Sequence, residues 1–270
     1  NSRNESVIIS DDKPFLLIDF STDVSNNIYT TKAPNQDGET FRESDLDMRE
    51  INIELMVVGD SRDSLLRQKS LINRVFNPKL GMGTLQYEDN GVVRVIKGQV
   101  DGLPFFGGKG AVTSSCLISL ISPSPYWTEK TMSTVEMVSW VGGLQFPLSL
   151  PTEFASKGEV KININNSGDV DTPIFLEVKG PATNPKITNV STGEYIKVNR
   201  ELALGETLTI STEFGNKTVK KDGVNVFNYI DINSVFFNLS LGDNLIELTT
   251  DSESDNASVT ITYTKKFIGV

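Results

Sequence analysis

Apolar and polar residues alternate in short runs along most of the chain, which is the pattern of half-buried β-strands. An Asn-Gly pair at positions 90 and 91 separates two such runs and predicts a tight β-hairpin. The first half of the chain is therefore expected to be mostly β. Its strand-like runs are residues 14–20, 51–57, 84–87, 92–100 and 112–121.

One segment, residues 61–76, follows a helical period instead. Asp60 or Ser61 can cap its first free backbone N–H groups, and Asn77-Pro78 ends it because the residue before proline is pushed out of helical geometry. We expect its apolar stripe to pack on a sheet. The residues of that stripe are Leu65, Leu66, Ile72, Val75 and Phe76.

Residues 21–46 are polar and too long for an ordinary connection inside a compact domain. Turn-forming pairs occur at 26–27, 34–35 and 37–38. The second half is acidic, with only Arg42 and Arg49 opposing Asp37, Glu39, Glu43, Asp45, Asp47 and Glu50. We interpret the segment as a projecting hairpin or arm, with a partly disordered loop as the alternative. The candidate interaction residues of this arm are Asn26, Asn27, Asp37, Gly38 and Glu39.

A change of organisation occurs at residues 122–127. Pro123 and Pro125 enforce an extended, stiff backbone there, and Tyr126 and Trp127 follow directly. The one helix lies before this point, whereas short strands with frequent turns follow it. We therefore predict two domains, residues 1–127 and 128–270, of which the second is a two-sheet sandwich or jelly roll.

The composition removes several kinds of chemistry. The 270 residues include no histidine and one cysteine, so Ser-His-Asp triads, Cys-His pairs and histidine zinc sites are excluded. Cys116 cannot form an internal disulfide, and its apolar neighbours predict a buried core residue. We expect no catalytic residue, no metal site and no cofactor.

The charge balance restricts the partners. The net charge is −10, and neither half is basic: residues 1–127 carry 13 basic and 17 acidic side chains, and residues 128–270 carry 12 and 18. A protein that grips phosphate backbones or anionic membranes needs the opposite sign. No apolar run reaches the roughly 18 residues of a membrane span, so no membrane partner is expected.

An ordered set of short motifs resembles the distal tail protein of siphovirus-type phages. No single motif is specific, but the set runs through nearly the whole chain. The matching segments are residues 58–62, 76–78, 85–87, 93–98, 122–127, 184–190, 192–196, 220–223, 228–229 and 258–261.

The resemblance implies a fold and an assembly. The N-terminal domain would be a β-sandwich with one helix, at about 61–76, and a projecting arm, at about 21–46. Six copies would form a ring at the tip of a non-contractile tail, made in the cytoplasm of the bacterial host. The C-terminal domain would be a galectin-like β-sandwich that points outward.

The resemblance also implies partners. The ring would join the major tail protein of the tube to a tail-tip protein, either a tail-associated lysin or a fibre protein. A receptor-binding protein is a further partner, docked on the C-terminal domain. DNA would only pass through the ring lumen, where acidic side chains would keep it from sticking.

Two other functions stay open at this point. A cell-wall carbohydrate-binding module would act through the C-terminal sandwich and would need a cleft lined by Trp140, Tyr195 or Tyr229. Galectin-type sugar sites use a histidine, which the chain lacks. A wall hydrolase would need a carboxylate pair about 5–10 Å apart in a groove.

Overall fold

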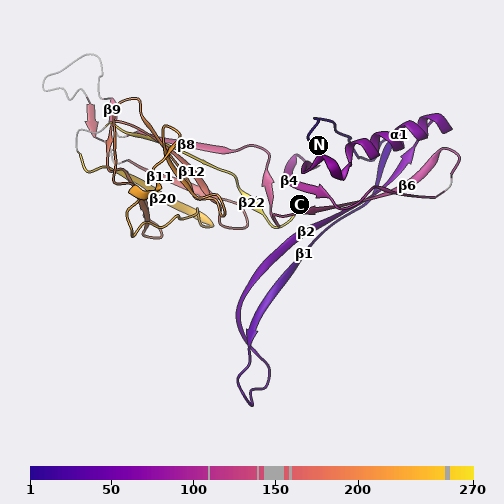
Figure 1. Ribbon diagram of the computed structural model, residues 1–270, viewed down its shortest axis with the longest axis horizontal. Coiled ribbons are helices and arrows are strands. Elements are labelled where there is room, and N and C mark those ends of the chain that lie inside the picture. Colours follow the sequence, from indigo (N-terminus) through magenta and orange to yellow (C-terminus); the bar gives the residue numbers. More distant parts are fainter. Residues whose placement is uncertain (109, 139, 143–154, 158–159, 253–255) are drawn as a thin grey trace. The chain divides into compact units, whose positions relative to one another are not determined.

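The structure is a computed structural model in which the chain divides into two compact units, Asn1–Thr128 with Ile268–Val270, and Glu129–Phe267 (Figure 1). The sequence places the whole C-terminus in the second domain, whereas the last three residues belong to the first unit. The described residues are 1–108, 110–138, 140–142, 155–157, 160–252 and 256–270.

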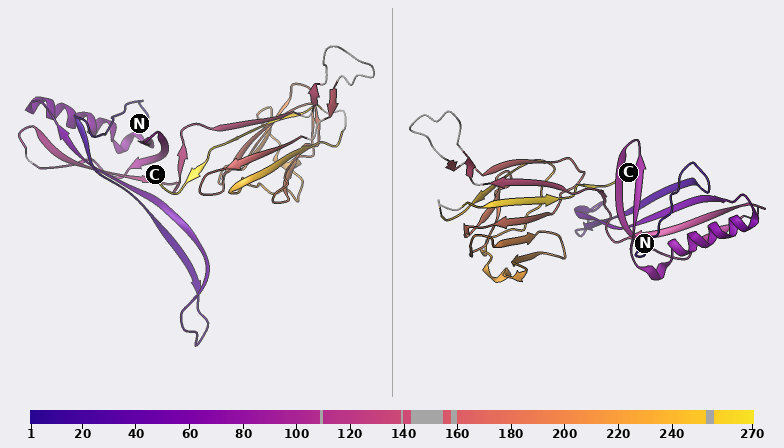
Figure 2. Two further views of the ribbon diagram at one scale, coloured as in Figure 1. Left: turned by 180° about the vertical axis from the view of Figure 1, so that it is seen from behind. Right: turned by 90° about the horizontal axis from the view of Figure 1, so that it is seen from above.

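The first unit is built on one curled sheet with the strand order β1-β2-β6-β4-β7, to which β3 adds on β4 and β5 on β6. One α-helix, α1 (Arg62–Val75), lies along a face of this sheet, and a short 3-10 helix, η1 (Pro78–Leu80), follows it (Figures 1 and 2). The strands are β1 (Phe15–Thr31), β2 (Thr40–Val58), β3 (Gly83–Asp89), β4 (Val92–Val100), β5 (Phe105–Gly107), β6 (Thr113–Ser122) and β7 (Trp127–Glu129).

The core of this unit lies between the sheet and α1. Alternate residues of β2 point inward, so Ile51, Ile53, Leu55 and Val57 are buried while their neighbours are more exposed. The β3–β4 hairpin turns at Asn90 and Gly91, which both have positive φ, as an Asn-Gly turn requires.

The helix begins and ends where its sequence signals lie. The Ser61 hydroxyl accepts a hydrogen bond from the Ser64 N–H at 3.2 Å, and Phe76 is the C-cap. Leu65, Ile72 and Val75 are buried, but Leu66 is 51% exposed, so the prediction that it faces the core is wrong. The reason is geometric, because each helical residue turns about 100° from the last and Leu66 leaves the stripe that Leu65 occupies.

Cys116 lies in the centre of β6, opposite Leu55, and is 1% exposed. Burial raises the pKa of its thiol to about 11, with nearby Lys69 opposing the shift. Since the thiolate is the reactive form, a raised pKa makes the native thiol inert at neutral pH. We expect no reaction with a disulfide reagent until denaturant unfolds the chain, measured by released thiolate absorbance. Rapid labelling of the native protein would contradict this placement.

The second unit is a sandwich of two antiparallel sheets, and the mainly β fold class with its β-sandwich is confirmed. One sheet has the order β11-β20-β14-β15 and the other β19-β18-β17-β12-β21-β8. A short 3-10 helix, η2 (Phe227–Tyr229), lies between β19 and β20. Four further strands form two short pairs, β9 with β10 and β13 with β16. The strands that follow β7 are β8 (Ser133–Val138), β9 (Trp140–Gly142), β10 (Ala155–Lys157), β11 (Lys161–Asn166), β12 (Ile174–Lys179), β13 (Ala182–Thr183), β14 (Lys186–Asn189), β15 (Glu194–Lys197), β16 (Glu201–Leu202), β17 (Thr207–Ser211), β18 (Thr218–Lys221), β19 (Val224–Asn225), β20 (Gly242–Thr249), β21 (Ser258–Tyr263) and β22 (Lys266–Phe267).

Buried asparagines hold the loops at one end of this sandwich. The Asn166 amide donates to the carbonyls of Val170 and Leu239, and the Asn244 amide donates to that of Ser240 at 2.8 Å. The Leu239 carbonyl also accepts from the Thr172 N–H at 3.0 Å, so side-chain and backbone hydrogen bonds together satisfy these loop carbonyls. Residues 237–241 alternate apolar and polar side chains as a strand does, but this segment makes only a single bridge, between Leu239 and Thr172.

Candidate interaction surfaces

Strands β1 and β2 continue beyond the sheet as a free-standing, two-stranded arm (Figure 1). The arm begins at the pair Val24 and Arg49 and ends at the pair Thr31 and Thr40. At about 3.3 Å per residue its paired stem is about 23 Å long. Irregularities in the pairing interrupt the register beyond Val24 and beyond Tyr29, and such bulges increase the twist and bend of a ribbon.

The predicted interaction residues separate into two groups on this arm. Asn26 and Asn27 lie inside β1, opposite Leu46 and Asp45, so their pair does not form a turn. Asp37, Gly38 and Glu39 lie at the tip, in the loop between the strands. Gly38 has a φ of +74°, which a residue with a Cβ rarely adopts.

The two faces of the arm differ in chemistry, because directly paired residues share a face and successive residues alternate. We call one the apolar face; it carries Ile28 and Phe41, each 61% exposed, with Thr30, Glu39 and Leu46. The Thr30 hydroxyl donates to the Glu39 carboxylate on this face.

The opposite face of the arm is acidic; it carries Asn27, Tyr29, Glu43 and Asp45, and Asp23 and Glu50 continue it just below the base of the arm. The Tyr29 hydroxyl lies 3.4 Å from a carboxylate oxygen of Asp45. The charge of Asp45 raises the pKa of Tyr29, with further contributions that include Glu43 and Asp47. The Tyr29 phenol is therefore held in its neutral, hydrogen-bond-donating form.

Arg49 fixes the base of the arm. It is 3% exposed, and its guanidinium donates to the carbonyl of Pro125 at 2.7 Å, to the hydroxyl of Thr22 at 2.5 Å and to the carbonyl of Ile268. Burial lowers the pKa of Arg49, and the charge of Asp23 opposes that shift. The sequence analysis counted Arg49 among the charged residues that oppose the acidic part of the arm. Its side chain instead faces inward, as do those of the alternate positions 51, 53, 55 and 57 of β2.

The predicted junction residues surround this point. Pro123 is exposed, Pro125 and Tyr126 are half-buried, and the side chain of Trp127 is fully buried. The Trp127 ring meets Phe20 and Tyr87 edge-on, with ring centroids 6.4 Å apart in both pairs. The junction is thus anchored in the first unit through an aromatic cluster as well as through Arg49.

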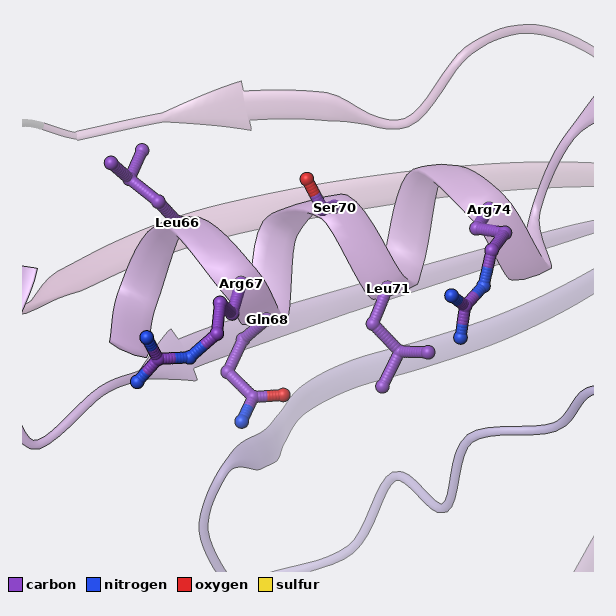
Figure 3. Close-up of a pocket in the computed structure, with 6 residues that line it drawn as sticks. All are labelled: Leu66, Arg67, Gln68, Ser70, Leu71 and Arg74. Atoms are coloured by element: carbon purple, nitrogen blue, oxygen red, sulfur yellow. The ribbon is translucent and has the colours of Figure 1, made fainter. Parts of the chain in front are cut away.

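A groove runs along the exposed side of α1, and sequence reasoning missed it. Figure 3 shows Arg67, Gln68, Leu71 and Arg74 projecting along one side of the helix, with Leu66 on the other. Arg74 forms an ion pair with Glu5 at 2.9 Å, whereas Arg67 forms no ion pair with another of the described residues. The signal in the sequence is Leu66, an apolar residue one step outside the buried stripe.

The described residues give little support to the two other functions. Lys186 lies over the ring of Tyr195 at 4.2 Å and Arg200 over that of Tyr229 at 4.4 Å, so one face of each ring is covered. The side chain of Trp140 lies outside the described residues. A hydrogen bond from Lys221 lowers the pKa of Glu206, and one from Asn184 lowers that of Asp251, whereas a glycosidase acid needs a raised pKa.

Within the described stretches of the chain, no three acidic or cysteine side chains gather as metal ligands do. None of the helices in those stretches has the length and apolar character that a bilayer crossing requires.

Comparison with known protein families gives two matches that together span most of the chain. Residues 3–109 match the phage tail protein RIFT-related domain, and residues 167–267 match the C-terminal domain of siphovirus-type tail components. Comparison with curated protein sequences finds no match.

Two solved structures of phage proteins align with most of the chain. The crystal structure of the SPP1 Dit protein, described as a paradigm of the hub adsorption apparatus in phages that infect Gram-positive bacteria, aligns with a TM-score of 0.67 at 15% identity. That alignment covers 94% of this chain and 93% of the SPP1 protein. The phage P2 baseplate in its activated conformation with Ca aligns with a TM-score of 0.47 at 14% identity, over 96% of this chain and 93% of that one.

The mainly β fold, the free-standing arm and the two family matches define a structural component of a phage tail. The chain belongs to the family of siphovirus-type distal tail proteins, whose place in the virion is the tail tip. The resemblance noted in the sequence is thereby confirmed, and the comparisons do not favour the carbohydrate-binding alternative.

Proposed function

We propose that six copies of this chain close into a ring that joins the tail tube to the tail-tip and adhesion apparatus. Its proposed partners are the major tail protein on one side and a tail-associated lysin or fibre protein on the other. A receptor-binding protein is a further proposed partner of the second unit. This role needs no catalytic chemistry and no cofactor.

The observation that carries the proposal is the arm. Beyond Arg49 none of its side chains is buried, and Ile28, Phe41 and Met48 are more than half exposed. A ribbon with two strands buries too little apolar surface to be stable by itself, so this one is suited to pack on another surface. A contact between an arm and a different surface of the next copy is head-to-tail, and head-to-tail contacts generate rings when the rotation closes.

The charge of the chain is compatible with a channel for DNA. The net charge of −10 includes the acidic face of the arm, and like charges repel the phosphate backbone. In the proposed ring these side chains would line the lumen, through which DNA passes without being bound. Acidic side chains confined to the outer rim of an assembled ring would contradict this part of the proposal.

The ring is tested with the full chain, alone and mixed with the purified major tail protein and tail-tip protein. Negative-stain microscopy and light scattering should show closed six-membered rings, either alone or once the partners are added. A variant in which an Asn-Gly turn replaces residues 26–46 should stay monomeric while keeping its circular dichroism spectrum and melting transition.

Two results would overturn the proposal. One is a full-length chain that stays monomeric in the presence of both tail partners. The other is a variant without the arm that forms the same rings as the full-length chain, because the arm would then have no part in assembly.

A further inference from the structure

The groove on α1 combines apolar and cationic side chains on a surface that the first unit leaves open. Leu71 lies with Arg67 and Arg74 on one side of the helix, and Leu66 projects from the other side (Figure 3). Apolar contacts beside a guanidinium favour an occupant that brings both apolar side chains and a carboxylate.

The apolar face of the arm has that composition. Ile28 and Phe41 supply exposed apolar area, and Glu39 supplies a carboxylate at the tip of the same face. The opposite face could not match the groove, because it carries carboxylates without large aliphatic side chains beside them. The chemical match therefore selects one face of the arm and not merely the arm as a whole.

The groove and the arm of one copy lie apart in the first unit. Figures 1 and 2 show the arm leading away from the part of the sheet that α1 covers. An arm of this length, about 23 Å of paired stem, has the reach to meet a neighbouring molecule.

We propose that the groove formed by Leu66, Arg67, Leu71 and Arg74 receives the apolar face of the arm of a second copy of this chain. The inference deepens the proposed ring and rests on it for the identity of the occupant. Glu39 of the arm meets the guanidinium of Arg67 in the groove, while Ile28 and Phe41 cover Leu71. Arm and groove are different surfaces, so the contact is head-to-tail.

The contact is tested by disulfide trapping in the full chain, with Cys116→Ala removing the native thiol. Glu39→Cys and Arg67→Cys in the same chain should give intermolecular disulfides under mild oxidation, seen as a ladder that ends at a closed six-copy species. The matched control places the arm cysteine on the opposite face, with Glu43→Cys in place of Glu39→Cys, and should give no ladder.

A charge exchange provides a second, independent readout. Glu39→Lys and Arg67→Glu should each weaken association about tenfold or more, and the double variant should recover it, because the two charges meet again in the opposite order. Glu43→Lys makes the same charge change on the acidic face and should leave association unchanged.

The outcomes separate the two proposals. A disulfide ladder without a closed species supports the arm-to-groove contact but contradicts the six-membered ring. Rings seen by microscopy, together with equal trapping by the Glu39 and Glu43 cysteines or no trapping by either, overturn the assignment of the groove while leaving the ring intact. Failure of the double charge variant to regain association also overturns the assignment.

Discussion

Replacing Arg49 by methionine is expected to lower the free energy of unfolding of the first unit by about 2–4 kcal/mol, since hydrogen bonds to a charged group contribute roughly 1.5–3 kcal/mol each. A buried ion pair can sometimes be replaced by apolar residues without cost because both partners are removed. Here two of the acceptors are the main-chain carbonyls of Pro125 and Ile268, which no side-chain substitution removes. Methionine therefore removes the donor from two partly buried carbonyls.

Denaturant unfolding followed by circular dichroism measures this loss, and hydrogen exchange locates it. Faster exchange should appear at the base of the arm and at residues 122–127. Arg49→Lys should be intermediate, because an ammonium group lacks the planar fork of donors that reaches several acceptors at once. Arg42→Met, on the exposed arm, should change stability by no more than about 0.5 kcal/mol. An Arg49→Met variant as stable as Arg42→Met would show that these bonds contribute nothing.

Replacing Trp127 by alanine is expected to cost about 3–5 kcal/mol, the range for removing a large aromatic side chain from a packed core. The indole is fully buried against Phe20 and Tyr87, and a cavity left there cannot be refilled by these neighbours, which are held on two different strands. Thermal unfolding should show the loss as a lower melting temperature.

Trp127→Phe separates packing from hydrogen bonding. The indole Nε1 is buried without a hydrogen-bond partner among the described residues, so phenylalanine gives up no bond and should cost clearly less than alanine. A phenylalanine variant as unstable as the alanine variant would indicate that the indole N–H does contribute.

The helix and the strands of the first unit could be predicted because their periods of 3.6 and 2 are local properties of the sequence. Leu66 shows the limit of that reasoning. The helical period identifies which side of the helix is buried, but it does not fix where the buried stripe ends, and Leu66 lies just outside the stripe. For the same reason the groove on α1 could not be predicted from the sequence. An exposed leucine becomes informative only when its neighbours in space, Arg67 and Leu71, are known.

Arg49 was missed for a different reason. Its position continues the inward alternation of β2, which was available from the sequence, but an arginine is rarely buried unless acceptors surround it. Those acceptors come from Thr22, Pro125 and Ile268, which are far from Arg49 in sequence. The return of the last three residues to the first unit could not be predicted for the same reason, because it depends on contacts between the two ends of the chain.

The arm also creates a hazard for the free protein. Beyond Val24 and Arg49, the described residues of β1 and β2 pair only with each other, so both outer edges present unused backbone N–H and C=O groups. Such edges are templates on which further chains add and aggregate. Asp23 and Glu50 face each other directly near the base of the stem, and the bulges farther along it bend the ribbon out of a flat shape. Charge and curvature together would discourage edge-to-edge stacking of newly made copies, at a small cost in the stability of each stem.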